Sequence, residues 1–281
     1  MSGPAARSRE SELMDTEPVG LDEFAACLRD LEWLNRWSLG YRPTLGWLAR
    51  IAPVNAPLSL LDVGCGYGDM LRRIRRWARR TGRDMTLTGV DINPWAREAA
   101  EAATPADASI RYLTSDVFAL PEQRYDIVIS ALFAHHLDDE ALVRFLRWMQ
   151  AHARRGWFIN DLHRHPVPYW FLRGLFAALP FNRLTVHDGP VSVSRAFVRR
   201  DWERLVAESG LERERIEIRW HAPFRWGVGT RPASGTRRRR CRSAPTGCRG
   251  AGWTRPCSRA RPCSGPRSGA AWPCARSRRG P

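Results

Sequence analysis

A short apolar run that ends in three alternate glycines limits what this chain can fold into more than any other feature. Residues 58–63 read Leu-Ser-Leu-Leu-Asp-Val, and Gly64, Gly66 and Gly68 follow at once. Such a run is typical of a buried parallel strand, and glycine lets the backbone turn tightly beside a ligand. From Asp69 the chain reads as a helix, whose N-terminal amides would face that ligand. The pattern predicts a strand, loop and helix that form a cofactor site.

The spacing of the glycines, and the acid before them, indicate which cofactor this is. Dinucleotide-binding loops follow G-x-G-x-x-G, whereas this loop is G-x-G-x-G and has Asp69 where the third dinucleotide glycine belongs. Asp62 places negative charge beside the loop, which suits a ligand with an ammonium and a sulfonium better than a pyrophosphate. With these residues the chain resembles the class I S-adenosylmethionine-dependent methyltransferases, whose first motif is D/E-x-G-x-G-x-G.

Strand-like and helix-like segments alternate through the chain up to residue 228. Further strands are expected over 85–91, 110–113, 125–130 and 156–160, helices over 21–51, 94–103, 138–153 and 200–209, and a hairpin over 215–220 and 224–228. Alternating strands and helices predict an α/β fold with a doubly wound parallel sheet. The resemblance implies a mostly parallel seven-stranded sheet, the Rossmann-like methyltransferase fold, with an antiparallel C-terminal hairpin.

Acidic residues follow successive predicted strands, and the carboxyl ends of parallel strands form ligand sites. Asp91 could accept hydrogen bonds from both ribose hydroxyls, and Asp116 from an adenine amine. Each alone is also a common turn or cap residue, and Asp91 would equally serve the ribose of NAD. The resemblance implies that the Val117 amide completes adenine recognition, that Ile92 packs on the adenine, and that the segment from Ser130 holds the methionine ammonium. The predicted residues for S-adenosylmethionine are Asp62, Gly64, Gly66, Gly68, Asp91, Ile92, Asp116, Val117 and Ser130.

A phenolic acceptor must lose a proton, and histidine suits that task near pH 7. His163 and His165, in the loop after the fifth strand, are the preferred general-base candidates. His136, after the fourth strand, is a third candidate, although a structural role as the cap of the next helix is the favoured interpretation. Asp161, His163 and His165 could also be metal ligands, but their spacing in an irregular loop is too unspecific, so no metal is predicted.

An aromatic segment at about 166–198 interrupts the alternation and reads as an insert or lid. Its predicted substrate-binding residues are Tyr169, Trp170, Phe171 and Phe176. An apolar lid implies an apolar or aromatic substrate, whereas a helix pair that completes the core or a dimer contact would explain it equally. The chain is similar to small-molecule methyltransferases of quinone and phenolic-lipid pathways, which implies O-methylation of a phenolic or quinone-like acceptor in secondary metabolism, with C-methylation as an alternative.

The net charge of +16 belongs to the end of the chain. All 45 basic residues are arginine, and fourteen of them lie between 229 and 281, where there is no acidic residue. Residues 1–228 therefore contain 31 arginines and 29 acidic residues, which nearly balance. This segment has no Leu, Ile, Val or Phe and cannot build a core. We expect residues 231–281 to be a disordered tail and hypothesise that it is a frameshifted end. An arginine-rich RNA-binding arm is the alternative, and no nucleic-acid substrate is expected for the domain.

The N-terminus is polar and has no apolar stretch of the kind that signal peptides need. Residues 1–20 are therefore expected to be disordered and residues 21–230 to form the domain, without a membrane span and in the cytoplasm. Two other functions stay open: an NAD(P)-dependent oxidoreductase on a similar fold, and a non-catalytic methyltransferase-like binding protein.

Overall fold

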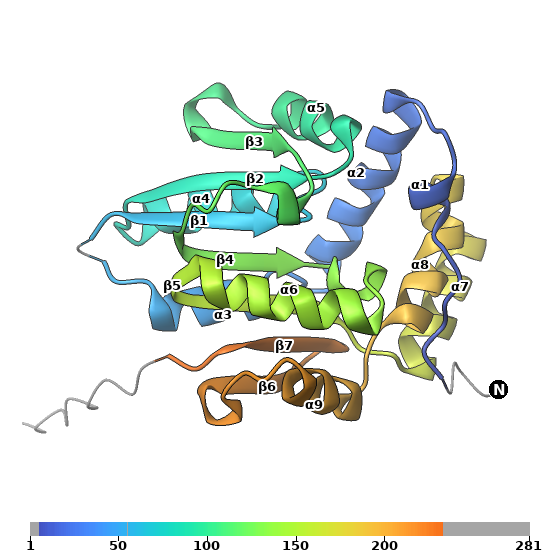
Figure 1. The fold of residues 1–281 in the computed structure, drawn as a ribbon. Helices are drawn as coiled ribbons and strands as arrows, with labels where there is room; N and C mark the ends of the chain where they lie inside the picture. The colour runs from blue at the N-terminus through green and yellow to red at the C-terminus, as the bar shows by residue number, and fades with distance from the viewer. Residues whose placement is uncertain (1–5, 55, 233–281) are drawn as a thin grey trace, which may run out of the picture. The chain divides into compact units, whose positions relative to one another are not determined.

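A computed structural model of the chain describes residues 6–54 and 56–232, which form a seven-stranded sheet with helices on both faces (Figure 1). The strand order is β3-β2-β1-β4-β5-β7-β6. The strands are β1 (Leu58–Val63), β2 (Met85–Asp91), β3 (Ile110–Thr114), β4 (Tyr125–Ala131), β5 (Ala153–Leu162), β6 (Ile216–His221) and β7 (Arg225–Thr230). Neighbours are parallel from β3 to β5, and β7 runs antiparallel to both β5 and β6. The predicted fold class is confirmed.

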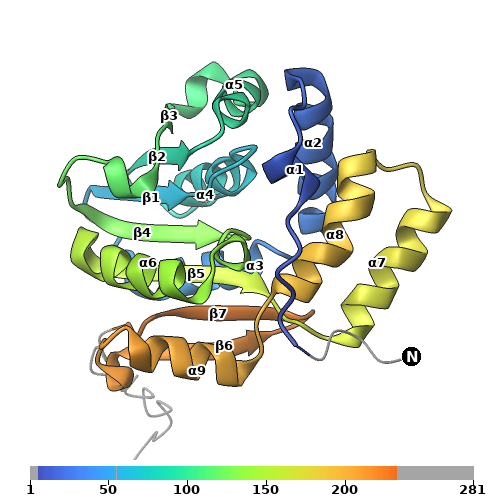
Figure 2. The ribbon, with the colours of Figure 1, turned by 45° about the vertical axis from the view of Figure 1, so that its right-hand side comes forward.

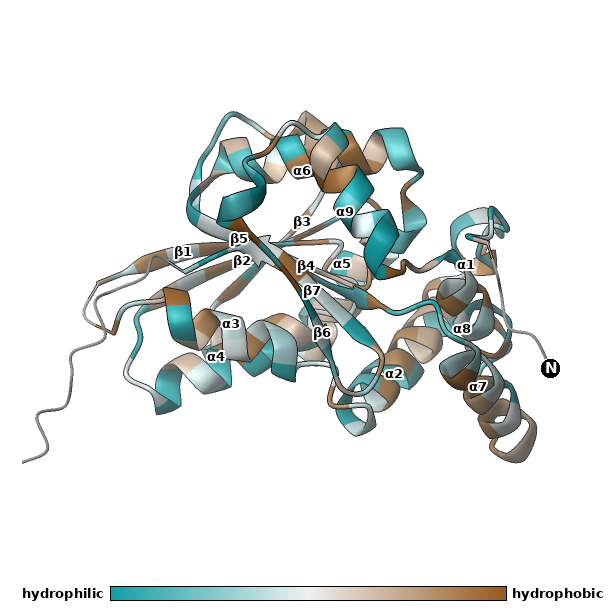
Figure 3. Ribbon diagram, turned by 90° about the horizontal axis from the view of Figure 1, so that it is seen from below, coloured by the Kyte–Doolittle hydropathy of each residue, from teal (hydrophilic) through white to brown (hydrophobic). Residues whose placement is uncertain are grey.

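The helices lie in two layers and in a group at the carboxyl ends of the parallel strands. They are α1 (Leu13–Thr16), α2 (Leu21–Trp37), α3 (Arg42–Ile51), α4 (Asp69–Arg80), α5 (Pro94–Ala103), α6 (Asp139–His152), α7 (Pro166–Ala178), α8 (Arg183–Arg195) and α9 (Arg199–Glu208). Short 3-10 turns are η1 (Ala106–Ala108), η2 (Val117–Ala119), η3 (Ala134–His136) and η4 (Arg213–Arg215). Seen from below, α6 and α9 cover one face of the sheet, and α3 and α4 cover the other (Figure 3). No helix in the described ranges is both long and apolar enough to cross a membrane.

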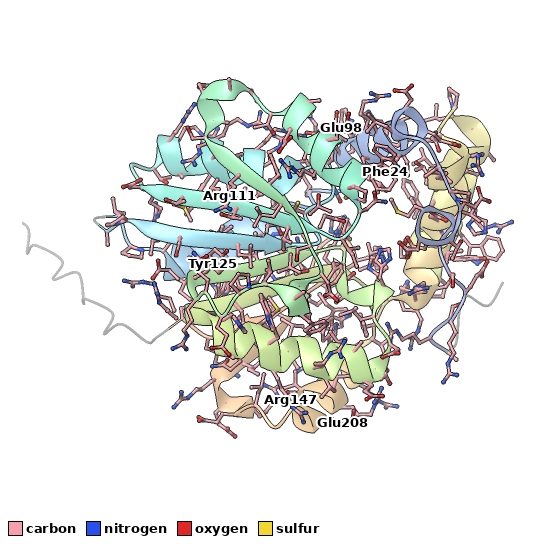
Figure 4. All side chains as sticks on the ribbon, turned by 45° about the horizontal axis from the view of Figure 1, so that its top comes forward. Phe24, Glu98, Arg111, Tyr125, Arg147 and Glu208 are labelled. Atoms are coloured by element: carbon pink, nitrogen blue, oxygen red, sulfur yellow. The ribbon has the colours of Figure 1, made fainter. Side chains whose placement is uncertain are left out.

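The core has one apolar cluster on each face of the sheet. Phe145 of α6 and Trp202 of α9 are fully buried in the first cluster, and Trp47 of α3 and Ile74 of α4 in the second. Each such side chain contributes about 1.5–3 kcal/mol when it leaves water. Arg147 of α6 donates to the backbone oxygen of Glu208, the last residue of α9, at 3.0 Å (Figure 4). The sheet is therefore a stiff base for the loops at its edge.

The glycine loop turns as the sequence predicts. Gly64, Gly66 and Gly68 have φ values of +67°, +45° and +69°, a region that L-residues other than glycine adopt at a cost. A Cβ on Gly64 would lie 2.6 Å from the Phe133 ring, and one on Gly68 would meet the Tyr112 hydroxyl. The loop thus needs glycine for its conformation and also for the space around it.

The expectation that residues 1–20 are disordered is wrong for residues 6–20. Arg7 donates to the backbone oxygen of Arg195 at 2.7 Å and pairs with Asp139 at 2.8 Å. Asp188 of α8 accepts from the amides of Leu13 and Met14 at 2.8 and 3.1 Å, which caps α1. These partners lie more than 120 residues away in the chain, so no local sequence pattern predicts the contacts.

Other boundaries differ less from the expectation. The predicted helix over 21–51 is two helices, because the chain turns between α2 and α3 at Leu39, whose φ is +56°. Strand β5 extends beyond 156–160 at both ends. The segment at about 166–198 forms α7 and α8. From residue 233 on, the predicted tail lies outside the described residues.

Two glycine substitutions test the packing of the loop. Gly82 also has a positive φ, +63°, but a Cβ there has no atom within 4 Å. We expect Gly82→Ala to lower the free energy of unfolding by about 1 kcal/mol, the backbone cost alone. Gly68→Ala should lower it by about 3 kcal/mol, because the Cβ also displaces Tyr112. Urea unfolding measures both values, and equal losses would contradict this account of the loop.

Candidate functional site

A cavity of about 1180 Å³ lies where β1, β2 and β4 end. Its wall includes the glycine loop, the segments after β2, β3 and β4, and residues of α2, α7 and α8. Figure 2 shows α1, α2, α7 and α8 grouped at this end of the sheet. A narrow side pocket of about 30 Å³ adjoins the cavity, and Gly64, Cys65 and Arg225 belong to both walls. The side pocket has room for a small polar group.

Most of the predicted cofactor residues line the large cavity. They are Gly64, Gly66, Asp91, Ile92, Asp116 and Val117. The Asp91 carboxylate accepts from the amides of Gly66 and Asn93 at 2.9 and 3.0 Å, and so it joins two loops. Burial raises the pKa of Asp91 against the effect of these hydrogen bonds. Asp116 accepts from the Phe118 amide at 2.9 Å and caps η2.

Two predicted cofactor residues have structural contacts instead. Ser130 is buried, and its hydroxyl donates to the backbone oxygen of Val63 at 2.9 Å, between β4 and β1. Gly68 is the N-cap residue of α4. Neither lines the cavity or its side pocket, but Ala131 and Leu132, directly after Ser130, line both. The segment after β4 therefore reaches the site one residue later than Ser130.

The side pocket holds two buried oxygen atoms without a hydrogen-bond donor among the described residues. They are Oδ1 of Asp62 and Oδ1 of Asn160. Burial raises the pKa of Asp62 well above its usual range, and the charges of Asp69 and Asp91 add to the effect. The Asn160 amide donates to the backbone oxygen of Gly40 at 2.7 Å, so its orientation is set. An unpaired buried acceptor costs about 1–3 kcal/mol, and a cationic N–H donor would satisfy both oxygens.

A buried arginine faces the same place. Arg225 is the first residue of β7, and its guanidinium donates to Oδ1 of Asn35 at 2.9 Å. Burial lowers the pKa of Arg225 to about 10, so it stays charged at neutral pH. Within the described ranges no carboxylate oxygen lies within 4.0 Å of this guanidinium. The sequence did not predict a cofactor role for Asn160 or Arg225. No local pattern distinguishes Arg225 from the many other arginines of the chain.

His163 and His165, the preferred candidates for the general base, do not line the cavity. Nδ1 of His163 accepts from Nε1 of Trp220 at 3.2 Å, and burial lowers the pKa of His163. Nδ1 of His165 accepts from the Val167 amide at 3.2 Å and caps α7. Both side chains thus have contacts away from the cavity wall.

His136 does line the cavity, and so does the neighbouring His135. Nδ1 of His136 lies 2.8 Å from Oδ2 of Asp15. Burial disfavours its protonation, but Asp15 and Glu12 outweigh burial and raise the pKa of His136 to about 9. The neighbouring His135 is buried, and its Nδ1 lies 2.7 Å from Oδ1 of Asp161. A protonated His136 at neutral pH does not act as a base.

The insert contributes to the wall through α8 and through one face of α7. Of the predicted substrate residues only Phe171 lines the cavity, while Tyr169, Trp170 and Phe176 do not. Phe176 is buried and packs edge to face on Phe181. The other residues of α7 on the wall are Val167, Pro168, Leu172 and Leu175. They share a helical face with Phe171, so the aromatic content predicted the helix but not its orientation.

Comparisons with known proteins agree with this geometry. Residues 60–156 match a family described as a methyltransferase domain. The plantazolicin methyltransferase BpumL, solved with SAH, is 16% identical over 74% of this chain and 76% of its own, with a TM-score of 0.54. Human N-acetylserotonin methyltransferase, solved with SAM, is 16% identical over 75% of this chain and 56% of its own, also with a TM-score of 0.54. No curated protein matches the sequence significantly.

The family match covers β1, the glycine loop and the strands up to the start of β5, and the two solved structures share the fold. The match supports a methyltransferase rather than the NAD(P)-dependent oxidoreductase that the sequence left open. The chain therefore contains a methyltransferase domain, as the sequence predicted, and shares its fold with methyltransferases solved with SAM or SAH.

Proposed function

We propose that this methyltransferase acts on the oxygen of a phenolic or quinone-like small molecule. The observation that carries the proposal is the size and lining of the cavity. Ligand pockets have volumes of about 300–1000 Å³, and this cavity, at about 1180 Å³, has room for an acceptor beside the cofactor. Much of the wall is apolar, with Phe24, Leu28 and Leu31 from α2 and Phe171 and Leu175 from α7. An aromatic acceptor suits such a wall.

The residues at the strand ends fit S-adenosylmethionine in our proposal. Asp62 and Asn160 would accept hydrogen bonds from its ammonium, because each has a buried oxygen without a donor among the described residues. Arg225 would pair with its carboxylate. Asp91 would accept from the ribose hydroxyls, and Ile92, Asp116 and Val117 would surround the adenine. Asp62 would then lie beside the ammonium, and Arg225 beside the carboxylate, of the amino-acid end of the cofactor.

The chain's own part in the reaction is to position the acceptor and to exclude water. When bound, S-adenosylmethionine supplies the methyl carbon to the deprotonated acceptor oxygen, and the electron pair of the broken C–S bond stays on sulfur. The helices α2, α7 and α8 would hold the aromatic ring beside the glycine loop. Glu12 and His135 are titratable groups on this wall that would handle the hydroxyl proton.

A direct assay tests the acceptor class. Full-length protein is incubated with S-adenosylmethionine and separate acceptors: alkyl-substituted phenols, hydroxyquinones, amines and RNA. We expect S-adenosylhomocysteine to form with the phenols or hydroxyquinones, and mass spectrometry of the product to place the methyl group on oxygen. Methylation of amines or RNA without methylation of any phenolic compound would overturn the proposal.

Asp62→Asn tests the site for the ammonium. We expect the Kd of S-adenosylhomocysteine to rise by about tenfold or more, equivalent to about 1.4 kcal/mol, because a neutral amide attracts the ammonium less. Methylthioadenosine, which lacks the amino-acid end, should bind both proteins equally. Calorimetric titration measures both ligands. A loss of affinity for both ligands would point to a damaged fold, and unchanged affinity for S-adenosylhomocysteine would refute the assignment of Asp62.

The raised pKa of Asp62 also predicts a dependence of stability on pH. Above pH about 4 the unfolded chain releases the Asp62 proton, whereas the folded protein retains it until its higher pKa is reached. The free energy of unfolding of the cofactor-free protein should therefore fall as the pH rises through this window. Asp62→Asn lacks this contribution, so the variant should gain stability relative to the parent with rising pH. Urea unfolding between pH 4 and 8 measures the difference, and a constant difference would contradict it.

Two neighbouring aromatic residues of α7 test the acceptor wall. Phe171 lines the cavity and Trp170 does not, although both are partly exposed on the same helix. We expect Phe171→Ala to raise the KM for the acceptor by about tenfold, because about 1.5 kcal/mol of apolar contact is lost. Trp170→Ala is the matched control and should leave KM within twofold. Equal effects of both substitutions on KM would exclude α7 as the acceptor wall.

A further inference from the structure

One carboxylate and two imidazoles meet at the wall of the cavity. Nε2 of His135 lies 3.5 Å from Oε1 of Glu12, and Nε2 of His136 lies 3.7 Å from Oε2 of the same carboxylate. The ligand atoms of the three residues all lie within 4.8 Å of one another. Glu12 and His135 are buried, and His136 is half-buried. These three residues are the Glu12 cluster.

The separations in the Glu12 cluster are those of ligands around a metal ion. Hydrogen bonds from nitrogen to oxygen are about 2.7–3.2 Å long, so both Nε2 atoms stand too far from Glu12 for a good hydrogen bond. A tetrahedral ion with Zn–N and Zn–O bonds of about 2.0–2.2 Å separates neighbouring ligand atoms by about 3.4 Å. The observed 3.5 and 3.7 Å, each to a different oxygen of Glu12, are close to that spacing.

On each histidine of the cluster, Nδ1 contacts a second carboxylate, while Nε2 faces Glu12. Nδ1 of His135 lies 2.7 Å from Asp161, and Nδ1 of His136 lies 2.8 Å from Asp15. Asp161 and Asp15 can each accept a hydrogen bond from the Nδ1–H of the histidine beside them. Each Nε2 faces Glu12, and an ion that binds there would displace the proton from a charged imidazole. Metal-bound histidines almost always have such an outer carboxylate or carbonyl.

Glu12 is also fixed in place. Its Oε1 accepts from the Ser192 hydroxyl at 2.9 Å, and Asp188 caps the helix that begins after it. The nearby arginines do not pair with Glu12. Arg195 donates instead to the backbone oxygens of His135 and His136 at 3.1 and 2.8 Å, which holds η3. The Glu12 carboxylate is thus left to the two imidazoles and the Ser192 hydroxyl.

We propose that Glu12, His135 and His136 bind one divalent transition-metal ion, and that zinc fits this set of two imidazoles and one carboxylate. Three protein ligands leave a fourth position, which would face the cavity because all three residues line it. The use of that position rests on the proposed function: a phenol oxygen bound there gives its proton to solvent and remains as the nucleophile. The ion binding itself is independent of the acceptor.

The test measures zinc binding without any acceptor. Full-length protein is stripped with a chelator, and its cysteines are alkylated, because five of the seven lie at 241, 248, 257, 263 and 274 and thiolates also bind zinc. Calorimetric titration with zinc chloride should show one ion per chain. Glu12→Gln and His136→Asn should each weaken binding by about a hundredfold or more, and Asp15→Asn by about ten- to a hundredfold. His221→Asn, on β6, is the control and should leave the affinity unchanged.

Two results would overturn the proposal. One is that the alkylated protein binds no zinc, and the other is that Glu12→Gln and His136→Asn bind it as tightly as the parent. Affinity for S-adenosylhomocysteine and the metal-free Tm show that each variant is folded. If Glu12→Gln does not fold, the half-buried His136 and Asp15 supply the same comparison. Zinc binding by a protein that methylates no phenol would leave the metal site standing and refute only the proposed acceptor.

Discussion

The buried carboxylate of Asp62, at the end of a central strand, is the constraint around which the site is organised. One of its oxygens has no donor among the described residues, and burial makes its ionised form costly. The protein can keep it there because β1 lies between β2 and β4 and its apolar neighbours Leu60, Leu61 and Val63 are buried in the two core clusters. The packing of the sheet thus offsets the cost of a buried oxygen that a hydrogen-bond donor on a ligand would satisfy.

The other parts of the site follow from where the parallel strands end. Asp91 joins the loop after β2 to the glycine loop, and the segment after β4 reaches the side pocket through Ala131 and Leu132. Strand β7 runs the opposite way, so its first residue, Arg225, enters from the same edge of the sheet. The carboxyl groups of Asp62 and Asp91 and the guanidinium of Arg225 therefore lie at the same end of the sheet. Their charges are complementary to the ammonium and the carboxylate of an amino-acid zwitterion.

The second half of the cavity is built by contacts between distant segments. Residues 6–20 lie against α8 and η3, with Arg7, Glu12 and Asp188 among the residues that hold them. This arrangement places Glu12 beside His135 and His136, although more than 120 residues separate them. The N-terminal segment is thus part of the cavity wall, and its loss would remove a carboxylate as well as a cover.

The sequence by itself determined the alternation of strands and helices, the glycine turn and the acids after the strands, because these depend on neighbours a few residues away. Strand 85–91 and helix 94–103 have the predicted bounds. Only the tertiary structure decided that Phe171, and not Trp170, lines the cavity and that His163 and His165 do not. It also brought Glu12 and Arg225 to the cavity wall and Asn160 to the side pocket. The physical reason is that a side chain's direction depends on the packing of its whole element, which contacts far along the chain set.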